Sequence, residues 1–340
     1  TASYRGEVSI SRFTLLSVEN GGEQFSIDTR YDYIELPEDN GYQANKTLVV
    51  RIEDANSQES TSPENIDYAP IDDICRLIQL ASRHYIVCLG MTVTSQTFYA
   101  QHYRLDRIRP ETKSVKASHN DYLLDRSLAQ EFLQQGYDAL SLSEGWGDRI
   151  RSAIASLVQP SRGTIEGRFM AQFSALEELI EEYAKNEGRV RILSQGQFKK
   201  LSSKIKSIIT DSVDDKNARQ KIIRQLPALN NVSLQDRFES FCDAKGIHYA
   251  DLWPVFSDSS ASLYKIRNRL VHSRALTPDE FLFVISAAKS LRSLLERAVL
   301  SLLGWPVSKS DVSSSAIRYK HGFEEGLTAD VSGLEKLWKV

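Results

Sequence analysis

The stretch LTPDEFLFVISAAKSLRSLLERAVLSLLGWP, residues 276–306, carries the clearest helical pattern of the chain. Thr277 can act as N-cap, Pro278 suits the first helical position, and Glu280 can close a capping box. Gly304 and Pro306 then favour a stop. Apolar side chains recur between them at alternating spacings of three and four: Phe281, Val284, Ala288, Leu291, Leu295, Ala298 and Leu302. This pattern predicts a long helix with one buried face.

Two upstream stretches show the same period. The stretch GTIEGRFMAQFSALEELIEEYAKNEG aligns Phe169, Phe173, Leu176, Ile180 and Tyr183 on one face. The stretch QGQFKKLSSKIKSIITDSV aligns Phe198, Leu201, Ile205 and Ile208. We expect these stripes to form the core of an antiparallel helical bundle.

The first part of the chain has a different pattern. Segments such as KTLVVRIED and RHYIVCLGMTVTSQTFYAQHYRL are rich in β-branched and aromatic residues, and turn-prone pieces separate them. One helix, APIDDICRLIQLAS, interrupts the strands. The predicted fold class is therefore α+β: a β-rich N-terminal domain at 1–125 with one inserted helix, then an all-α antiparallel bundle at 146–306. A helical connection at 126–145 joins them, and a polar tail with at most a weak closing helix occupies 307–340.

Composition limits the function classes. The 340 residues are 41% hydrophobic and 26% charged with a net charge of -3, so the chain as a whole is not a basic nucleic-acid binder. No apolar run is long enough for a membrane span, and the N-terminus lacks the layout of a signal peptide. Cys75, Cys88 and Cys242 have no metal-ligand spacing and read as buried thiols. We expect a cytoplasmic protein.

The stretch LYKIRNRLVHSR, Leu263 to Arg274, carries the strongest chemical signal. A helix capped by Ser257 or Asp258 would bury Leu263, Ile266 and Leu270 and turn His272 nearly opposite them, with Arg267 on the flank. A histidine titrates near neutral pH and can move a proton, and an arginine can hold a phosphate. With the 2′-hydroxyl of RNA as nucleophile, this pair can cleave RNA to a 2′,3′-cyclic phosphate and a 5′-hydroxyl. An exposed basic helix face is the alternative interpretation.

The motif Arg267-Asn268, followed after three more residues by His272, resembles that of the HEPN ribonuclease family (higher eukaryotes and prokaryotes nucleotide-binding domains). The likeness covers about residues 146–306. With a β-rich region ahead of it, the chain is most similar to the ApeA-type HEPN proteins of bacterial anti-phage defence.

The resemblance implies a homodimer that pairs through the motif helices into one composite cleft. Arg267 would hold the scissile phosphate, His272 would act as general acid and base, and Asn268 would position them. Glu177, about 80° from the apolar stripe of its helix, is the candidate supporting residue, and a solvated flank residue is the alternative. The expected activity is that of a metal-independent endoribonuclease on tRNA or another structured RNA, in a toxin or abortive-infection effector. No cofactor is expected.

Between Arg189 and Arg224 there are ten Lys or Arg and three Asp. This stretch could follow an RNA backbone, or it could be solvated helix surface that offsets the acidic residues at Glu177–Glu182. The candidate RNA-binding residues are Lys265, Arg269, Arg274, Lys199, Lys200 and Lys204.

Two further alternatives remain open. The bundle could be a non-catalytic HEPN dimerisation or interaction module, although members of that kind tend to lose the Arg or the His. Because the chain does not begin with Met, it could also be the nuclease part of a larger regulated complex. In either case the N-terminal domain could bind a trigger ligand or protein.

Overall fold

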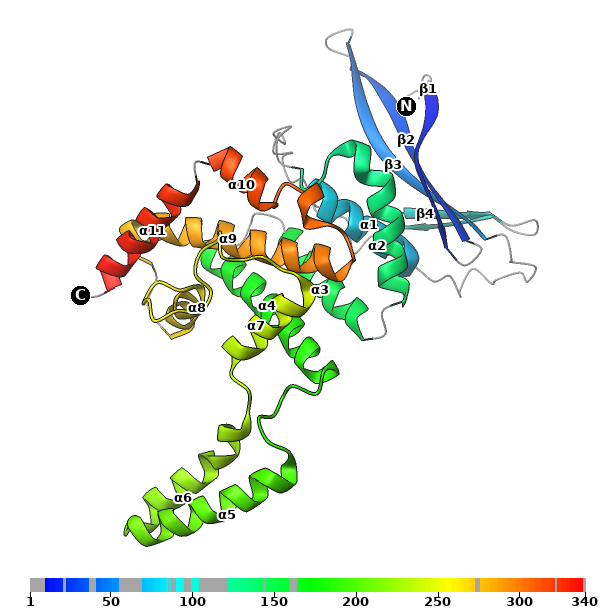
Figure 1. Cartoon of the computed structure of the whole chain (residues 1–340). Coiled ribbons are helices and arrows are strands. Elements are labelled where there is room, and N and C mark those ends of the chain that lie inside the picture. Colours follow the sequence, from blue (N-terminus) through cyan, green and yellow to red (C-terminus); the bar gives the residue numbers. More distant parts are fainter. Residues whose placement is uncertain are drawn as a thin grey trace, which may run out of the picture. The chain divides into compact units, whose positions relative to one another are not determined.

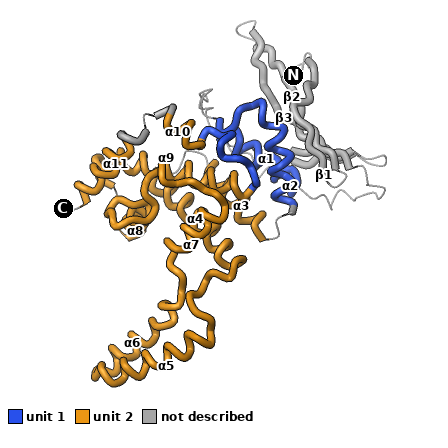
Figure 2. The backbone as a smooth tube through the Cα atoms, viewed as in Figure 1, with its two compact units in different colours: residues 1–143, 303–311 blue, residues 144–302, 312–340 orange. Residues whose placement is uncertain are grey.

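The computed structural model describes the backbone of residues 10–20, 23–36, 41–54, 69–84, 86, 90–94, 99–103, 122–142, 145–158, 164–272, 276–321 and 323–338. Side chains are described for residues 69–84, 86, 122–141, 145–158, 164–272, 276–318 and 326–338. The chain divides into two compact units, shown in Figure 2. Unit 1 comprises residues 1–143 and 303–311, and unit 2 comprises residues 144–302 and 312–340.

The strands of unit 1 form two separate antiparallel sheets. The larger has the order β1-β2-β3, and the smaller is the pair β4-β5 (Figure 1). Their bounds are β1 Ile10–Asn20, β2 Glu23–Leu36, β3 Gly41–Asp54, β4 Gly90–Thr94 and β5 Tyr99–Tyr103.

The described side-chain packing of unit 1 is helical. Its helices are α1 Ala69–Ser82, η3 Arg126–Leu128, α2 Ala129–Leu142 and η5 Val307–Lys309. Leu77 of α1 and Phe132 of α2 are fully buried. A Cβ at Gly136 of α2 would lie 2.8 Å from a methyl carbon of Leu77, so glycine allows the two helices to approach closely. The indole of Trp305 packs edge-on against Phe132, which brings the segment 303–311 into this unit.

These observations correct the predicted fold class. The α+β prediction with a β-rich N-terminal domain at 1–125 was wrong: the part whose side chains are described is mainly all-α, about 77% helical and without a strand. The alternation in sequence predicted which segments can pair as strands, but a domain also needs a buried core. In unit 1 the described core residues belong to α1, α2 and the segments next to them.

Unit 2 is built around two long helices. The helix α4 contacts α3, α7, α8 and α9, and α9 in turn contacts α3, α7, α8 and α11. The bounds are α3 Trp146–Val158, α4 Ile165–Asn186, α5 Gln195–Ser212, α6 Lys216–Gln225, η4 Leu226–Asn230, α7 Leu234–Lys245, α8 Leu263–His272, α9 Pro278–Leu302, α10 Ser314–His321 and α11 Phe323–Trp338.

The stripe predicted for α4 is confirmed, and that of α9 is confirmed from Val284 to Ala298, whereas Phe281 is 42% exposed and Leu302 is only partly buried. The whole apolar stripe of α4 is buried, from Phe169 to Tyr183. At the start of α9, the Thr277 N–H donates to the Glu280 carboxylate at 2.8 Å, and the Glu280 N–H donates to the Thr277 hydroxyl at 3.3 Å. This reciprocal pair is the predicted capping box. Gly304 lies at φ +71° just past the end of the helix, where a left-handed residue is favoured.

The stripe of α5 was predicted to be core, and that prediction was wrong. Neither α5 nor α6 has a buried residue, and the side chain of Ile208 is 63% exposed. Figure 1 shows the two helices side by side as a hairpin that extends from the rest of unit 2. An amphipathic pattern predicts a helix with an apolar face, but it does not show whether a partner element covers that face.

The C-terminal segment is also different from its prediction. Instead of a polar tail at 307–340, residues 314–338 form α10 and α11, and α11 packs against α9. Leu334 is fully buried, and the Trp338 indole N–H donates to the Glu280 carboxylate at 2.6 Å. Few apolar positions were needed to dock this helix, which is why its pattern looked weak.

None of the helices in the described part of the chain has the length and apolarity that crossing a bilayer requires.

Candidate functional site

The helix that carries the motif, α8, begins later than predicted. A cap at Ser257 or Asp258 is ruled out, because the helix starts at Leu263. The indole of Trp253 is fully buried and its N–H donates to the Ala261 carbonyl at 2.6 Å. The segment between these two residues therefore folds around the Trp253 ring instead of forming helical turns.

The same loop supplies the hydrogen bonds that the first turn of α8 needs. The Leu263 N–H donates to the Pro254 carbonyl at 2.8 Å, and the Tyr264 N–H donates to the Val255 carbonyl at 3.1 Å. A third donor, the Lys265 N–H, is accepted by the Ser262 hydroxyl at 3.4 Å, so Ser262 is the side-chain cap of this end. Leu263 and Ile266 are fully buried and fix the rotation of α8 about its axis.

That rotation directs Arg267 toward α4. Its Nη2 lies 3.5 Å from the Oε2 of Glu177, and its Nη1 donates to the Oδ1 of Asn268 at 3.1 Å. The side chains of Arg267 and Glu177 are 29% and 27% exposed, so both reach solvent. The Arg267 Nε is buried and has no hydrogen-bond partner among the described residues. The structure thus brings together three of the predicted site residues and leaves one guanidinium donor unused.

The neighbouring positive charges only partly offset the cost of burying the Glu177 carboxylate. Burial raises the pKa of Glu177, the charges of Arg267 and Arg237 lower it, and the result is a pKa above the ordinary value. Arg267 therefore does not recover the cost of desolvating this carboxylate. A phosphate diester, which stays ionised at neutral pH, can compete with Glu177 for the guanidinium.

His272 is not part of this contact. It is the last residue of α8 and is exposed, as its spacing predicted. Five residues after Arg267, it lies about 7.5 Å further along the axis and about 140° around it. Within the described part of one chain, no hydrogen bond or ion pair holds its imidazole. One chain alone therefore does not place the imidazole beside the Arg267 guanidinium.

The predicted RNA-binding residues lie in different settings. Lys265 is exposed on α8. Arg269 contacts Glu280 at 2.8 Å and stacks over the Trp338 ring at 4.5 Å, so its charge is already engaged. Arg274 lies outside the described residues. The other three candidates are exposed on α5, in the hairpin rather than on α8: Lys199, Lys200 and Lys204.

Arg237 was not predicted to belong near the motif. It lies on α7, and its charge acts on both Glu177 and Glu181 of α4. No spacing in the sequence connects it with either residue, because the hairpin and its connections separate α4 from α7 along the chain. The contact between these two helices is a property of the fold alone.

Thiols and metal ligands add little to this site. Cys75 and Cys242 are buried thiols, as expected, and Cys88 lies outside the described residues. Burial raises the pKa of Cys242 to about 12, so this thiol stays protonated at neutral pH. Among the described residues, no three His, Cys, Asp or Glu side chains are grouped so that they could hold a metal ion.

Comparisons of the chain with protein-family models, with curated proteins and with solved structures found no match.

Proposed function

We propose that this protein is a metal-independent endoribonuclease that acts as a homodimer through the α8 helices. The observation that carries the proposal is the Arg267 guanidinium: half-buried beside Glu177, open to solvent and with its Nε unpaired among the described residues. The likeness of the motif to that of HEPN ribonucleases supports the same assignment. The proposed substrates are tRNA or another structured RNA.

The reaction uses the nucleophile that RNA already carries. His272 of one protomer takes the proton from a 2′-hydroxyl, and the 2′-oxygen attacks the adjacent phosphorus. The bond from phosphorus to the 5′-oxygen breaks, and the second His272 of the dimer donates a proton to that oxygen. Arg267 donates hydrogen bonds to the phosphate oxygens as negative charge builds on them. The products are a 2′,3′-cyclic phosphate and a 5′-hydroxyl.

In this mechanism Asn268 and Glu177 are positioning residues. The Asn268 oxygen accepts a hydrogen bond from the guanidinium, and Glu177 holds the other edge of the same group. When a phosphate binds, it displaces Glu177 while Asn268 keeps the guanidinium oriented. Asn268 also lies one helical turn before His272 on α8 and can orient its imidazole.

Exposed apolar side chains near the motif support a dimer. Val271 is 48% exposed at the end of α8, and Phe281 and Leu282 are 42% and 68% exposed in the first turn of α9. Phe281 and Leu282 are adjacent in sequence, and exposed apolar side chains that lie together are typical of a surface that another protein covers. A two-fold contact there would bring each His272 toward the Arg267 of the other protomer.

The biological role of a toxin or anti-phage effector rests on the resemblance, as does a sensing or restraining role for the N-terminal region. A toxic nuclease requires control, and a trigger ligand or protein bound by that region would provide it.

The experiment is RNA cleavage in EDTA, followed by analysis of the RNA ends. We expect the wild-type chain to produce cyclic-phosphate ends, and Arg267→Ala and His272→Ala to lose cleavage while remaining folded and dimeric. The matched control is Arg149→Ala. Arg149 is a half-exposed arginine of α3 that pairs with Glu178, the residue after Glu177, at 3.2 Å. A folded wild-type dimer that binds RNA without cleaving it would instead favour a non-catalytic interaction module.

A further inference from the structure

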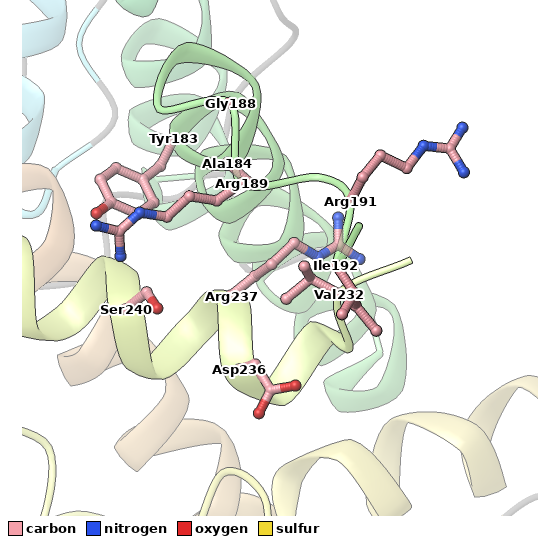
Figure 3. Close-up of a pocket in the computed structure, with 10 residues that line it drawn as sticks. All are labelled: Tyr183, Ala184, Gly188, Arg189, Arg191, Ile192, Val232, Asp236, Arg237 and Ser240. Atoms are coloured by element: carbon pink, nitrogen blue, oxygen red, sulfur yellow. The ribbon is translucent and has the colours of Figure 1, made fainter. Parts of the chain in front are cut away.

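Unit 2 contains a pocket of about 400 Å³ where the end of α4 and the loop after it meet α7. Figure 3 shows its lining residues. Three of them are arginines, Arg189 and Arg191 from the loop and Arg237 from α7, and Asp236 is its only acidic residue. The hydroxyl groups of Tyr183 and Ser240 are further potential donors. The lining therefore has a net charge of about +2, which favours an anionic ligand.

Backbone hydrogen bonds hold the loop that carries two of these arginines. The Arg189 N–H donates to the Ala184 carbonyl at 2.8 Å, and the Val232 N–H donates to the Val190 carbonyl at 3.1 Å. Arg191 forms an isolated antiparallel bridge with Asn231. The positive charges are thus presented from an ordered backbone, so little conformational entropy is lost when an anion binds.

The guanidinium groups keep donors for a ligand. Arg191 donates to the Asn231 side-chain oxygen at 2.7 Å, and Arg237 uses only its Nε, toward the Ser233 carbonyl at 3.4 Å. Arg189 has no hydrogen bond or ion pair from its side chain to other described residues. Asp236 accepts the Ser233 hydroxyl at 2.6 Å and forms no ion pair with the three arginines. Their charge is therefore not neutralised within the pocket.

We propose that this pocket binds a second backbone phosphate of the RNA strand that is cleaved at Arg267, a few nucleotides away from the scissile one. The identity of the ligand as RNA rests on the proposed function. That the pocket binds an anion is argued independently, from its arginines and its volume.

The position of the pocket suits that role. Its lining residue Ala184 and the site residue Glu177 both belong to α4, seven residues or about 10 Å apart along the axis. Arg237 belongs to the pocket, and its charge also lowers the pKa of Glu177. A single strand that crosses α4 can therefore contact Arg267 with one phosphate and the pocket with another a few nucleotides away. Contacts of this kind fix the register of the strand rather than read its bases.

The test is binding of a fluorescein-labelled 2′-O-methyl RNA, which lacks the nucleophile and cannot be cleaved. Anisotropy is measured over a range of salt concentrations for the wild type, Arg189→Gln, a triple variant at Arg189, Arg191 and Arg237, and the control Arg149→Gln. Each lost phosphate contact of a single strand lowers the slope of log K against log salt by about 0.7. We expect Arg189→Gln to weaken binding, and the triple variant, which loses the one phosphate contact of the pocket, to lower the slope by about 0.7.

The outcomes separate this proposal from the nuclease. If the triple variant keeps the affinity and slope of the wild type and cleavage still depends on Arg267, the proposal that the pocket binds RNA is wrong, whereas the ribonuclease proposal is unaffected. If RNA binding depends on the arginines but the wild type cleaves no RNA, the pocket proposal is supported and the ribonuclease proposal is wrong. Competition distinguishes the source of the phosphate: if inorganic phosphate or AMP binds the pocket and the RNA does not, the RNA assignment is wrong.

Discussion

Unit 2 contains two contacts between an arginine and a carboxylate that differ in almost every property. Arg297 meets Asp251 through two parallel hydrogen bonds of 2.6 and 2.9 Å, and its side chain is 1% exposed. Arg267 meets Glu177 at 3.5 Å, and both side chains reach solvent. One contact is complete and enclosed, and the other is loose and open.

The pKa shifts of the two carboxylates separate the contacts further. Burial raises the pKa of Asp251, but the hydrogen bonds and charge of Arg297 outweigh it and hold the pKa well below its ordinary value. At Glu177 burial dominates, and the pKa stays above its ordinary value despite Arg267. The first arginine is fully used in joining α9 to the loop before α8. The second keeps capacity for another anion, which is the property a phosphate-binding arginine needs.

The largest effect is expected at the enclosed pair. Arg297→Ala leaves the Asp251 carboxylate buried without its partner, and also removes the donor to the Val312 carbonyl. Breaking one side of a buried ion pair costs about 3–5 kcal/mol. We expect the free energy of unfolding, measured by urea denaturation, to fall by this amount. A loss below about 1 kcal/mol, the value typical of an exposed pair, would remove the distinction between the two contacts.

The next effect is on catalysis. Arg267→Ala is expected to lower the rate of RNA cleavage by about 100-fold or more, the usual result of removing a preorganised donor to a developing oxyanion. Its effect on the free energy of unfolding should stay within about 1 kcal/mol, because the pair is half-exposed. Single-turnover cleavage and urea denaturation measure the two quantities. Loss of stability in proportion to loss of activity would indicate a structural arginine instead.

The contributions of the two carboxylates to the free energy of unfolding should also change in opposite directions with pH. The raised pKa of Glu177 means that its contribution to stability is present below about pH 4.5 and is lost as pH rises through its folded value. The lowered pKa of Asp251 means that its contribution is present above about pH 4 and is lost as pH falls.

Urea denaturation of Glu177→Gln and Asp251→Asn between pH 3 and 7 tests these signs. The free energy of unfolding of Glu177→Gln, relative to that of the wild type, should increase as pH rises. That of Asp251→Asn, relative to the wild type, should decrease. Parallel pH dependence in both variants would show that Arg267 compensates Glu177 as fully as Arg297 compensates Asp251.

The smallest effect is expected at a third pair, Arg149 with Glu178, whose side chains are 41% and 44% exposed. Arg149 also lies 3.7 Å from Glu182, but its own side chain is half-exposed, so Arg149→Ala should change the free energy of unfolding by less than about 1 kcal/mol. Cleavage should be unaffected. A substantial loss of cleavage in this variant would mean that the general positive charge around α4 matters, rather than the position of Arg267.

Part of this arrangement could be predicted from the sequence, because it depends on local periodicity. The stripes of α4 and α9, the Thr277 cap and the exposure of His272 follow from helical spacing. The resemblance implied a supporting polar residue on α4, the angular position of Glu177 favoured that residue, and the structure brings it to Arg267.

Other features depend on contacts between distant segments and were missed. The start of α8 is determined by the loop around Trp253, and the approach of Arg237 to α4 by the packing of α7. The stripe of α5 has the period of a core helix, yet no element in the described part of the chain buries it. For the same reason, strand-like alternation in the first part of the chain did not establish a β-rich domain.

The central claim is that the open arginine, and not the enclosed one, belongs to a ribonuclease site. The most direct measurement compares cleavage of total tRNA in EDTA by the wild type, Arg267→Ala, His272→Ala and Arg149→Ala, each shown to be folded and dimeric. We predict cyclic-phosphate ends from the wild type and Arg149→Ala, and none from the other two. Cleavage that survives both α8 substitutions, or its absence in the wild type, would contradict this account.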